Sequence, residues 1–275
     1  MNDGTIVELA PAKLNLALHV RRRRADGYHD LETLFAFCRD GDVIRLAPAV
    51  ADTFAITGPF GATLAAEGDN LVTRARDAFR AAFGVAPPCA IELEKNLPIA
   101  SGIGGGSADA AATLRALARW HDVAPDESRL FGIAARLGAD VPACLLGKSA
   151  IGEGRGDELR VVDGLAGRGV LLVNPRVAVS TARVFAGWDG VDRGAITGDP
   201  AEDRNDLTAP AVAAAPEIAT VLGALEALAN ARLVRMSGSG ATCFALFDVP
   251  ADARSAAAAI GAEHPGWWWL ASELA

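Results

Sequence analysis

The sequence predicts an α+β fold arranged in two lobes. Strand-like segments dominate the first part of the chain, and helix-like and strand-like segments alternate after it. With 275 residues, 51% of them hydrophobic, the chain can build one large domain or two lobes around a substantial core. We place the boundary near residue 160, which gives an N-terminal lobe, 1–160, and a C-terminal lobe, 161–275.

Residues 5–20 alternate in the manner of a β-strand. One face of this strand carries Leu14, Leu16, Leu18 and Val20, and the other carries Lys13, Asn15, Ala17 and His19. Because the leucine face belongs to a core, Lys13 and Asn15 are expected to point together at something else.

The rest of the N-terminal lobe contains short strands and amphipathic helices. Strands are expected at 35–37, 42–46 and 90–93, with a turn at Asp40-Gly41 between the first two. A helix capped by Asp69 or Asn70 should end at Gly84, a second should span 126–137, and a short one should open after Asp140.

The pattern restarts beyond residue 160. Strands are expected at 170–173, 244–247 and 267–270, and helices at 181–185, 216–229 and 252–260. The polar, glycine-bearing segment 189–206 is predicted to be a mobile surface loop.

The most informative segment is 98–109, where four glycines within five positions run into a helix expected from Ser107 to about Trp120. Glycine allows positive φ and a close approach to a ligand. The following helix presents free N–H groups and the positive end of its dipole. A phosphate-binding site, and therefore an ATP-binding enzyme, is the first hypothesis.

Two other phosphate-binding loops fit poorly. The Gly147-Lys148-Ser149 triplet lacks the first glycine of a Walker A loop, because Pro142 stands there, so a turn is favoured. A dinucleotide fingerprint starting at Gly102 would need glycine at position 107, where this chain has Ser107. It would also need a later acidic residue at a strand end, so a dinucleotide site is weakly supported.

Composition excludes several classes of function. The net charge of −8 argues against a nucleic-acid partner, although Arg21 to Arg24 form one basic run, expected to be a solvated strand end or a substrate-phosphate contact. No apolar stretch is long enough for a membrane span and no signal-peptide pattern is present, so a soluble cytoplasmic protein is expected. The four scattered cysteines are predicted to be buried thiols.

Three motifs, in order, resemble those of the GHMP kinase superfamily. They are Pro11-Ala-Lys-Leu-Asn-Leu16, the glycine segment from Pro98 to Ala108, and Met236-Ser-Gly-Ser-Gly-Ala-Thr-Cys-Phe-Ala245. The resemblance implies a two-lobed fold, with an N-terminal lobe like domain 2 of ribosomal protein S5 and a ferredoxin-like C-terminal lobe. Ser101 replaces a glycine usual in the loop, and Ile103 a leucine.

Further segments narrow the resemblance within that superfamily. Arg24 to Leu34, which includes Asp26-Gly-Tyr-His29, resembles the region with which one branch recognises cytidine, and Leu137–Pro142 and Asn205–Leu207 match other parts of it. The implied reaction is phosphorylation by ATP of a hydroxyl on a small cytidine diphosphate substrate. The implied partners include no nucleic acid and no membrane, and the protein is expected to be a monomer or homodimer.

The resemblance also implies functional residues. Lys13 and Asp140 would be catalytic, with Asp140 as general base, and the Ser107 hydroxyl would lie near Mg²⁺. The substrate would contact Asn15, Tyr28, His29 and Phe185. The ATP site would comprise Pro98, Ile99, Ala100, Ser101, Gly102, Ile103, Gly104, Gly105, Gly106, Ser107 and Ala108, together with Asn70 and Lys95.

Simpler explanations exist for several of these residues. Asp140 and Ser107 could be helix N-caps, Lys13, Asn70 and Lys95 could be solvated, and Gly27-Tyr28-His29 could be only a turn. Rival functions are a homoserine or mevalonate kinase, a catalytically inactive nucleotide-binding regulatory module, and a dinucleotide oxidoreductase.

Overall fold

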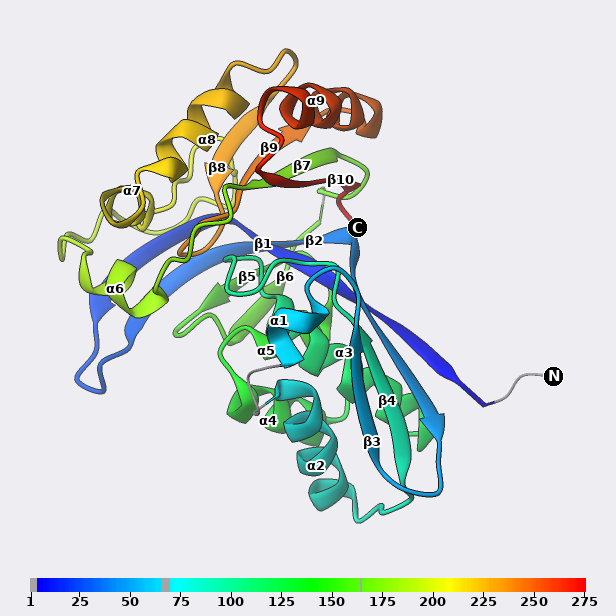
Figure 1. Ribbon diagram of the computed structural model, residues 1–275. Coiled ribbons are helices and arrows are strands. Elements are labelled where there is room, and N and C mark those ends of the chain that lie inside the picture. The colour runs from blue at the N-terminus through cyan, green and yellow to red at the C-terminus, as the bar shows by residue number, and fades with distance from the viewer. Residues whose placement is uncertain (1–3, 66–69, 164) are drawn as a thin grey trace. The chain divides into compact units, whose positions relative to one another are not determined.

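The computed structural model describes residues 4–65, 70–163 and 165–275 (Figure 1). The chain forms two compact units. Unit 1 comprises residues 1–12, 40–99 and 104–147, and unit 2 comprises 13–39, 100–103 and 148–275. The boundary near residue 160 stays a prediction. No helix among the described residues is long and apolar enough to cross a membrane.

Two long paired strands, β1 (Ile6–Arg23) and β2 (His29–Pro48), open the fold, and each contributes residues to both units. The turn predicted at Asp40-Gly41 is wrong, because β2 runs straight through these residues. A Cβ atom at Gly41 would collide with the Ala10 carbonyl of β1. The glycine therefore serves the close approach of the two strands rather than a reversal of the chain.

Unit 1 packs helices beside a sheet built on the second half of β2. Its remaining elements are β3 (Thr53–Thr57), α1 (Gly61–Ala65), α2 (Leu71–Phe83), β4 (Cys89–Glu94), α3 (Gly105–Trp120), α4 (Ser128–Leu137) and α5 (Val141–Leu146). Strand β4 pairs antiparallel with β2 and parallel with β3. Helix α3 is buried over most of its length and packs against α2, α4 and α5.

Helix α2 confirms the capping prediction. Asn70 is the N-cap, its side-chain oxygen accepting a hydrogen bond from Val72 N at 2.8 Å. Gly84 ends the helix in the left-handed conformation at φ 68°. Asp69, the alternative cap, lies outside the described residues.

Unit 2 contains β5 (Ala150–Glu153), β6 (Glu158–Val161), β7 (Gly169–Asn174), α6 (Thr181–Ala186), α7 (Thr208–Ala214), α8 (Glu217–Glu226), β8 (Leu233–Met236), β9 (Cys243–Phe247), α9 (Pro250–Glu263) and β10 (Trp268–Glu273). Strand β5 pairs with the first part of β2 and with β6. The other four strands form an antiparallel sheet in the order β10-β7-β9-β8. Helices separate β7 from β8 and β9 from β10, so this part has the order and connections of a ferredoxin-like fold.

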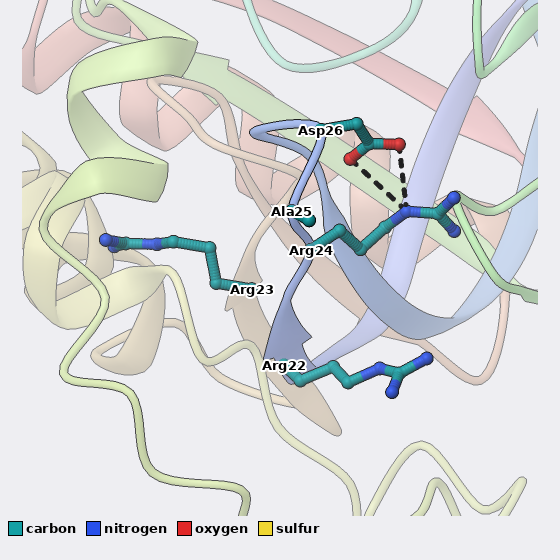
Figure 2. A pocket seen from close by; sticks show the side chains of 5 residues that line it. All are labelled: Arg22, Arg23, Arg24, Ala25 and Asp26. Atoms are coloured by element: carbon teal, nitrogen blue, oxygen red, sulfur yellow. Dashed lines mark hydrogen bonds and ion pairs between the residues drawn. The ribbon is translucent and has the colours of Figure 1, made fainter.

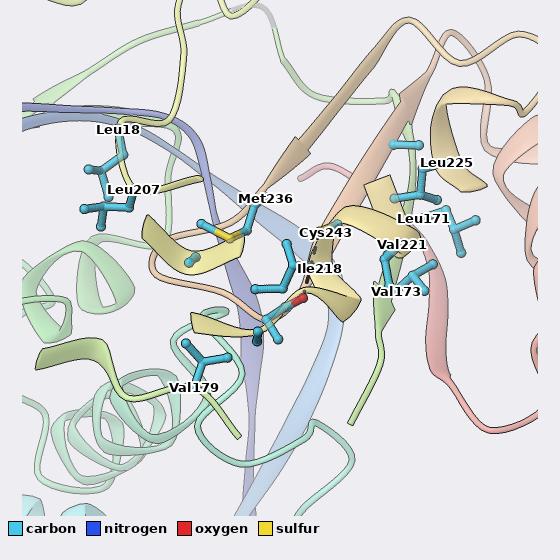
Figure 3. Close-up of a cluster of buried hydrophobic side chains, with 14 of the residues drawn as sticks. Leu18, Leu171, Val173, Val179, Leu207, Ile218, Val221, Leu225, Met236 and Cys243 are labelled. Atoms are coloured by element: carbon cyan, nitrogen blue, oxygen red, sulfur yellow. Dashed lines mark hydrogen bonds between the residues drawn. The ribbon is translucent and has the colours of Figure 1, made fainter. Parts of the chain in front are cut away.

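A large apolar cluster holds unit 2 together (Figure 3). Inward-facing residues of the sheet, such as Leu171 and Val173, meet Ile218 and Val221 of α8 and Ile260 of α9. Since these side chains are fully or almost fully removed from water, their burial fixes both helices on the sheet.

The segment 189–206 is irregular, as predicted, but it is tied to β1. Leu18 N donates to the Arg204 carbonyl at 2.8 Å, and Asp206 N donates to the Leu18 carbonyl at 2.9 Å. These bonds do not support the predicted mobility of this segment. All four cysteines are free and buried, as predicted.

Candidate functional site

The glycine segment 98–106 has a distinctive backbone. Ala100, Gly102 and Gly104 have φ of 50°, 78° and 67°, whereas the residues between them do not have positive φ. Such alternation turns successive N–H groups toward one side and makes a concave anion site. The N–H groups of Gly102, Ile103 and Gly104 donate to nothing in the described part of the chain, whereas the carbonyls of Ser101, Gly102 and Ile103 accept hydrogen bonds.

Within unit 2, residues 100–103 pack on the turn of the third motif. Ser237 Oγ donates to the Gly102 carbonyl at 3.0 Å, and Thr242 N donates to the Ser101 carbonyl at 3.1 Å. A Cβ at Gly102 would lie 2.6 Å from the Gly240 carbonyl oxygen and 2.7 Å from that of Ser237. This backbone-on-backbone contact explains why the third motif is rich in small residues.

Gly102→Ala is therefore expected to disturb the loop. The methyl group would collide with two carbonyl oxygens and occupy a left-handed backbone position, which together cost about 1–3 kcal/mol of strain. We expect the KM for ATP to rise at least tenfold. Gly84→Ala is the matched control, since Gly84 also has positive φ but an added Cβ would meet nothing within 4 Å. Equal KM values for ATP in the two variants would contradict the expectation.

Helix α3 begins directly after the glycines. Gly104 occupies the N-cap position, so no side chain caps the N–H groups at the start of this helix. Ser107 is the third helical residue, so the N-cap explanation for Ser107 is wrong. Its half-buried hydroxyl makes no hydrogen bond with the described residues. An unused hydroxyl in the first helical turn fits a Mg²⁺ ion bound mainly by phosphates and water. Among the described residues no cluster of three His, Cys, Asp or Glu side chains could hold a metal by itself.

Lys13 and Asn15 form a buried polar pair on β1, in unit 2. Lys13 Nζ donates to Asn15 Oδ1 at 2.9 Å, and Asn15 Nδ2 donates to Thr33 Oγ1 at 2.8 Å. Both side chains are only 3% exposed, so a solvated lysine is excluded here. The Asn15 amide oxygen thus holds the Lys13 ammonium, and the predicted substrate contact of Asn15 stays a prediction. Sequence reasoning missed Thr33.

Asp140 lies in unit 1, immediately before α5. It occupies the N-cap position, but its side chain makes no capping hydrogen bond and its φ and ψ of −83° and −13° are helical. The simple cap explanation therefore fails for the side chain. Gly147 ends this helix in the left-handed conformation, and β5 rather than a helix follows, which excludes a Walker A loop there.

Lys95 is not solvated but forms a buried ionic triad in unit 1. Its Nζ lies 2.5 Å from Asp42 Oδ2 and 2.6 Å from Asp109 Oδ2. Asp42 Oδ1 also accepts hydrogen bonds from the backbone N–H groups of Asn96 and Leu97, just before the glycine segment. The triad thus anchors the approach to that segment. The assignment of Lys95 to ATP stays a prediction that this geometry does not favour.

The triad carries two carboxylates for one ammonium. Asp109 Oδ1 is buried without a partner among the described residues. Burial is the main cause that raises the pKa of Asp109 to about 8, because the nearby Lys95 charge only partly offsets it.

Asp109→Asn is expected to flatten the pH dependence of stability between about pH 4 and 8. In this range Asp109 is protonated to a greater extent in the folded protein than in the unfolded chain, so its contribution to the free energy of unfolding falls as the pH rises. The asparagine does not titrate. Urea unfolding at several pH values measures the slope, with the exposed Asp77→Asn as control. An unchanged slope in Asp109→Asn would refute this assignment.

Unit 2 brings together His29 and Phe185, two of the four residues expected to contact the substrate. The centroids of the His29 and Phe185 rings lie 5.0 Å apart. Trp188, which sequence reasoning missed, forms a T-shaped pair with His29, with centroids 5.8 Å apart. His29 is buried, whereas Tyr28 is 56% exposed with the Arg155 guanidinium over its ring. Burial, and then the charge of Arg23, lower the pKa of His29.

A pocket of about 400 Å³ lies at the adjoining turn between β1 and β2 (Figure 2). It is lined by Arg22, Arg23, Arg24, Ala25 and Asp26. The residues between the two strands form a hydrogen-bonded turn, and their predicted contact with the substrate stays a prediction.

Two family models match this chain, and the first match includes the glycine segment. Residues 70–148 match the family model of the GHMP kinases N-terminal domain, and residues 194–266 match that of the GHMP kinases C-terminal domain. The chain belongs to the GHMP kinase family, and it is an ATP-dependent kinase.

The individual relatives are more specific. A 4-diphosphocytidyl-2-C-methyl-D-erythritol kinase from Rhizorhabdus wittichii is 53% identical, over 97% of this chain and 94% of the relative. A crystal structure of 4-(cytidine 5'-diphospho)-2C-methyl-D-erythritol kinase is 36% identical with a TM-score of 0.82, covering 98% of this chain and 99% of the other. Homoserine kinase from Cytophaga hutchinsonii, 19% identical with a TM-score of 0.71 over 99% and 95% of the two chains, shares the fold.

Proposed function

We propose that this kinase transfers the γ-phosphoryl group of ATP to the 2-hydroxyl of 4-diphosphocytidyl-2-C-methyl-D-erythritol, giving the 2-phosphate and ADP. This reaction would serve non-mevalonate isoprenoid precursor biosynthesis in the cytoplasm. The observation that carries the proposal is the similarity to kinases of that name over nearly the whole chain. The His29–Phe185 contact supports it, because an aromatic cluster with a hydrogen-bonding edge suits a cytosine ring.

The central residues of the candidate site have separate roles in this proposal. The free N–H groups of residues 102–104 and of the α3 N-terminus would bind the ATP phosphates. Asp140 would accept the proton of the 2-hydroxyl while the hydroxyl oxygen forms a bond to the γ-phosphorus and the bond from that phosphorus to ADP breaks. Lys13, oriented by Asn15, would stabilise negative charge beside the acceptor oxygen. Mg²⁺, when bound near Ser107, would neutralise phosphate charge.

Release of ADP tests the proposal directly. The purified protein is incubated with ATP and Mg²⁺ and, in parallel, with the cytidyl compound, homoserine or mevalonate. ADP formed with the cytidyl compound alone is the expected result. ADP with another alcohol would keep the kinase and discard the cytidine site, and ATP binding without turnover on any alcohol would favour a regulatory module.

A further inference from the structure

Four consecutive arginines, Arg21 to Arg24, lie where β1 ends at Arg23, and their side chains point in different directions. Side chains of a strand alternate between its faces, so Arg22 and Arg24 share one side and Arg23 takes the other. Figure 2 shows this arrangement, with Arg22 and Arg24 extending together and Arg23 pointing away from both.

The two groups differ in how their charge is compensated. Arg22 forms an ion pair with Asp30, and Arg24 lies 2.9 Å from Asp30 and 3.2 Å from Asp26. Arg23 makes no ion pair with any carboxylate in the ranges that the structure describes. Its one hydrogen bond there runs from Nε to His29 Nε2, at 3.4 Å. Arg23 is therefore an exposed cation whose charge the described residues leave uncompensated.

The position of Arg23 suggests what it attracts. His29, which it contacts, packs against Phe185 and Trp188, and the pocket of about 400 Å³ lies at the same turn. Its charge reaches His29, where it is the second cause of the lowered pKa. In a nucleotide the phosphates follow the base by one ribose, so a cation beside the base site is within reach of them. Guanidinium matches phosphate oxygens in geometry and charge.

We infer that Arg23 binds a phosphate group of the cytidine diphosphate substrate whose base lies against His29 and Phe185. The inference rests on the proposed function and extends it, because it names a residue that distinguishes a cytidine nucleotide from cytidine. The paired Arg22 and Arg24 instead hold the turn in shape.

Calorimetric titration with cytidine and with CDP tests this assignment. Arg23→Gln is expected to weaken CDP binding about 10- to 100-fold, the range for a lost charge-assisted hydrogen bond. Cytidine binding should change less than about twofold, and the salt dependence of CDP binding should decrease. Arg39→Gln is the control, because Arg39 is also an exposed arginine but pairs with Glu273 and does not line this pocket. Arg23→Lys, which keeps the charge, should recover part of the CDP affinity.

The outcomes separate this inference from the proposed function. Equal losses for cytidine and CDP in Arg23→Gln would show that Arg23 acts only through His29, and this would overturn the inference. Unchanged CDP binding would overturn it too, while leaving the cytidine site intact. Failure of the wild-type protein to bind either compound would overturn the proposed function itself, and the inference with it.

Discussion

Asp140→Asn is expected to lower kcat by about 10²–10⁴-fold, the range for removing a general base. The amide is nearly the same size as the carboxylate but cannot accept the proton of the 2-hydroxyl. The Asp140 side chain makes no capping hydrogen bond to α5, so the substitution removes no cap from this helix. Steady-state kinetics with saturating ATP and acceptor measures the effect, and thermal unfolding checks the fold.

Two further variants make the Asp140 result interpretable. Asp126→Asn, before α4, replaces another loop carboxylate of unit 1 and should leave kcat unchanged. Asn15→Leu removes the amide that holds Lys13 and should lower kcat while leaving Asp140 in place. A decrease below tenfold in Asp140→Asn would contradict the general-base role and leave catalysis to electrostatic stabilisation by Lys13 and Mg²⁺.

Lys95→Met is expected to destabilise the protein by about 3–5 kcal/mol, the cost of removing one partner from a buried ionic cluster. The variant leaves Asp42 and Asp109 buried together, with their oxygens no longer bridged by an ammonium. Asp42 would keep its backbone hydrogen bonds to Asn96 and Leu97. Urea unfolding at neutral pH measures the loss of free energy.

The exposed Lys148→Met is the matched control and should change stability by less than about 0.5 kcal/mol. Adding Asp109→Asn to Lys95→Met should change stability at neutral pH little further, because burial already keeps Asp109 mostly protonated there. If Lys95→Met unfolds like the wild-type protein but has a raised KM for ATP, the triad is not structural and the predicted ATP contact of Lys95 gains support.

Local signals were sufficient for much of this fold. The Asn70 cap and the Gly84 terminator delimit α2 as expected, because capping depends on residues adjacent in sequence. Lys13 and Asn15 alternate with leucines in the sequence, and this pattern correctly predicted that both polar residues lie on one strand. Short elements, such as β3, β5, β6 and α7, gave no comparable local signal, since four to seven residues are too few to establish a clear periodic pattern.

The sequence by itself determined the α+β class, the glycine segment leading into α3, and the resemblance to a kinase family, because these depend on motifs and local conformational preference. Only the tertiary structure decided the states of individual side chains. It buried Lys95 between Asp42 and Asp109 and set His29 against Phe185. It also extended β2 through Gly41, where contact with Ala10 outweighs the local preference for a turn. Burial and pairing across long sequence separations make these choices, and no local pattern records them.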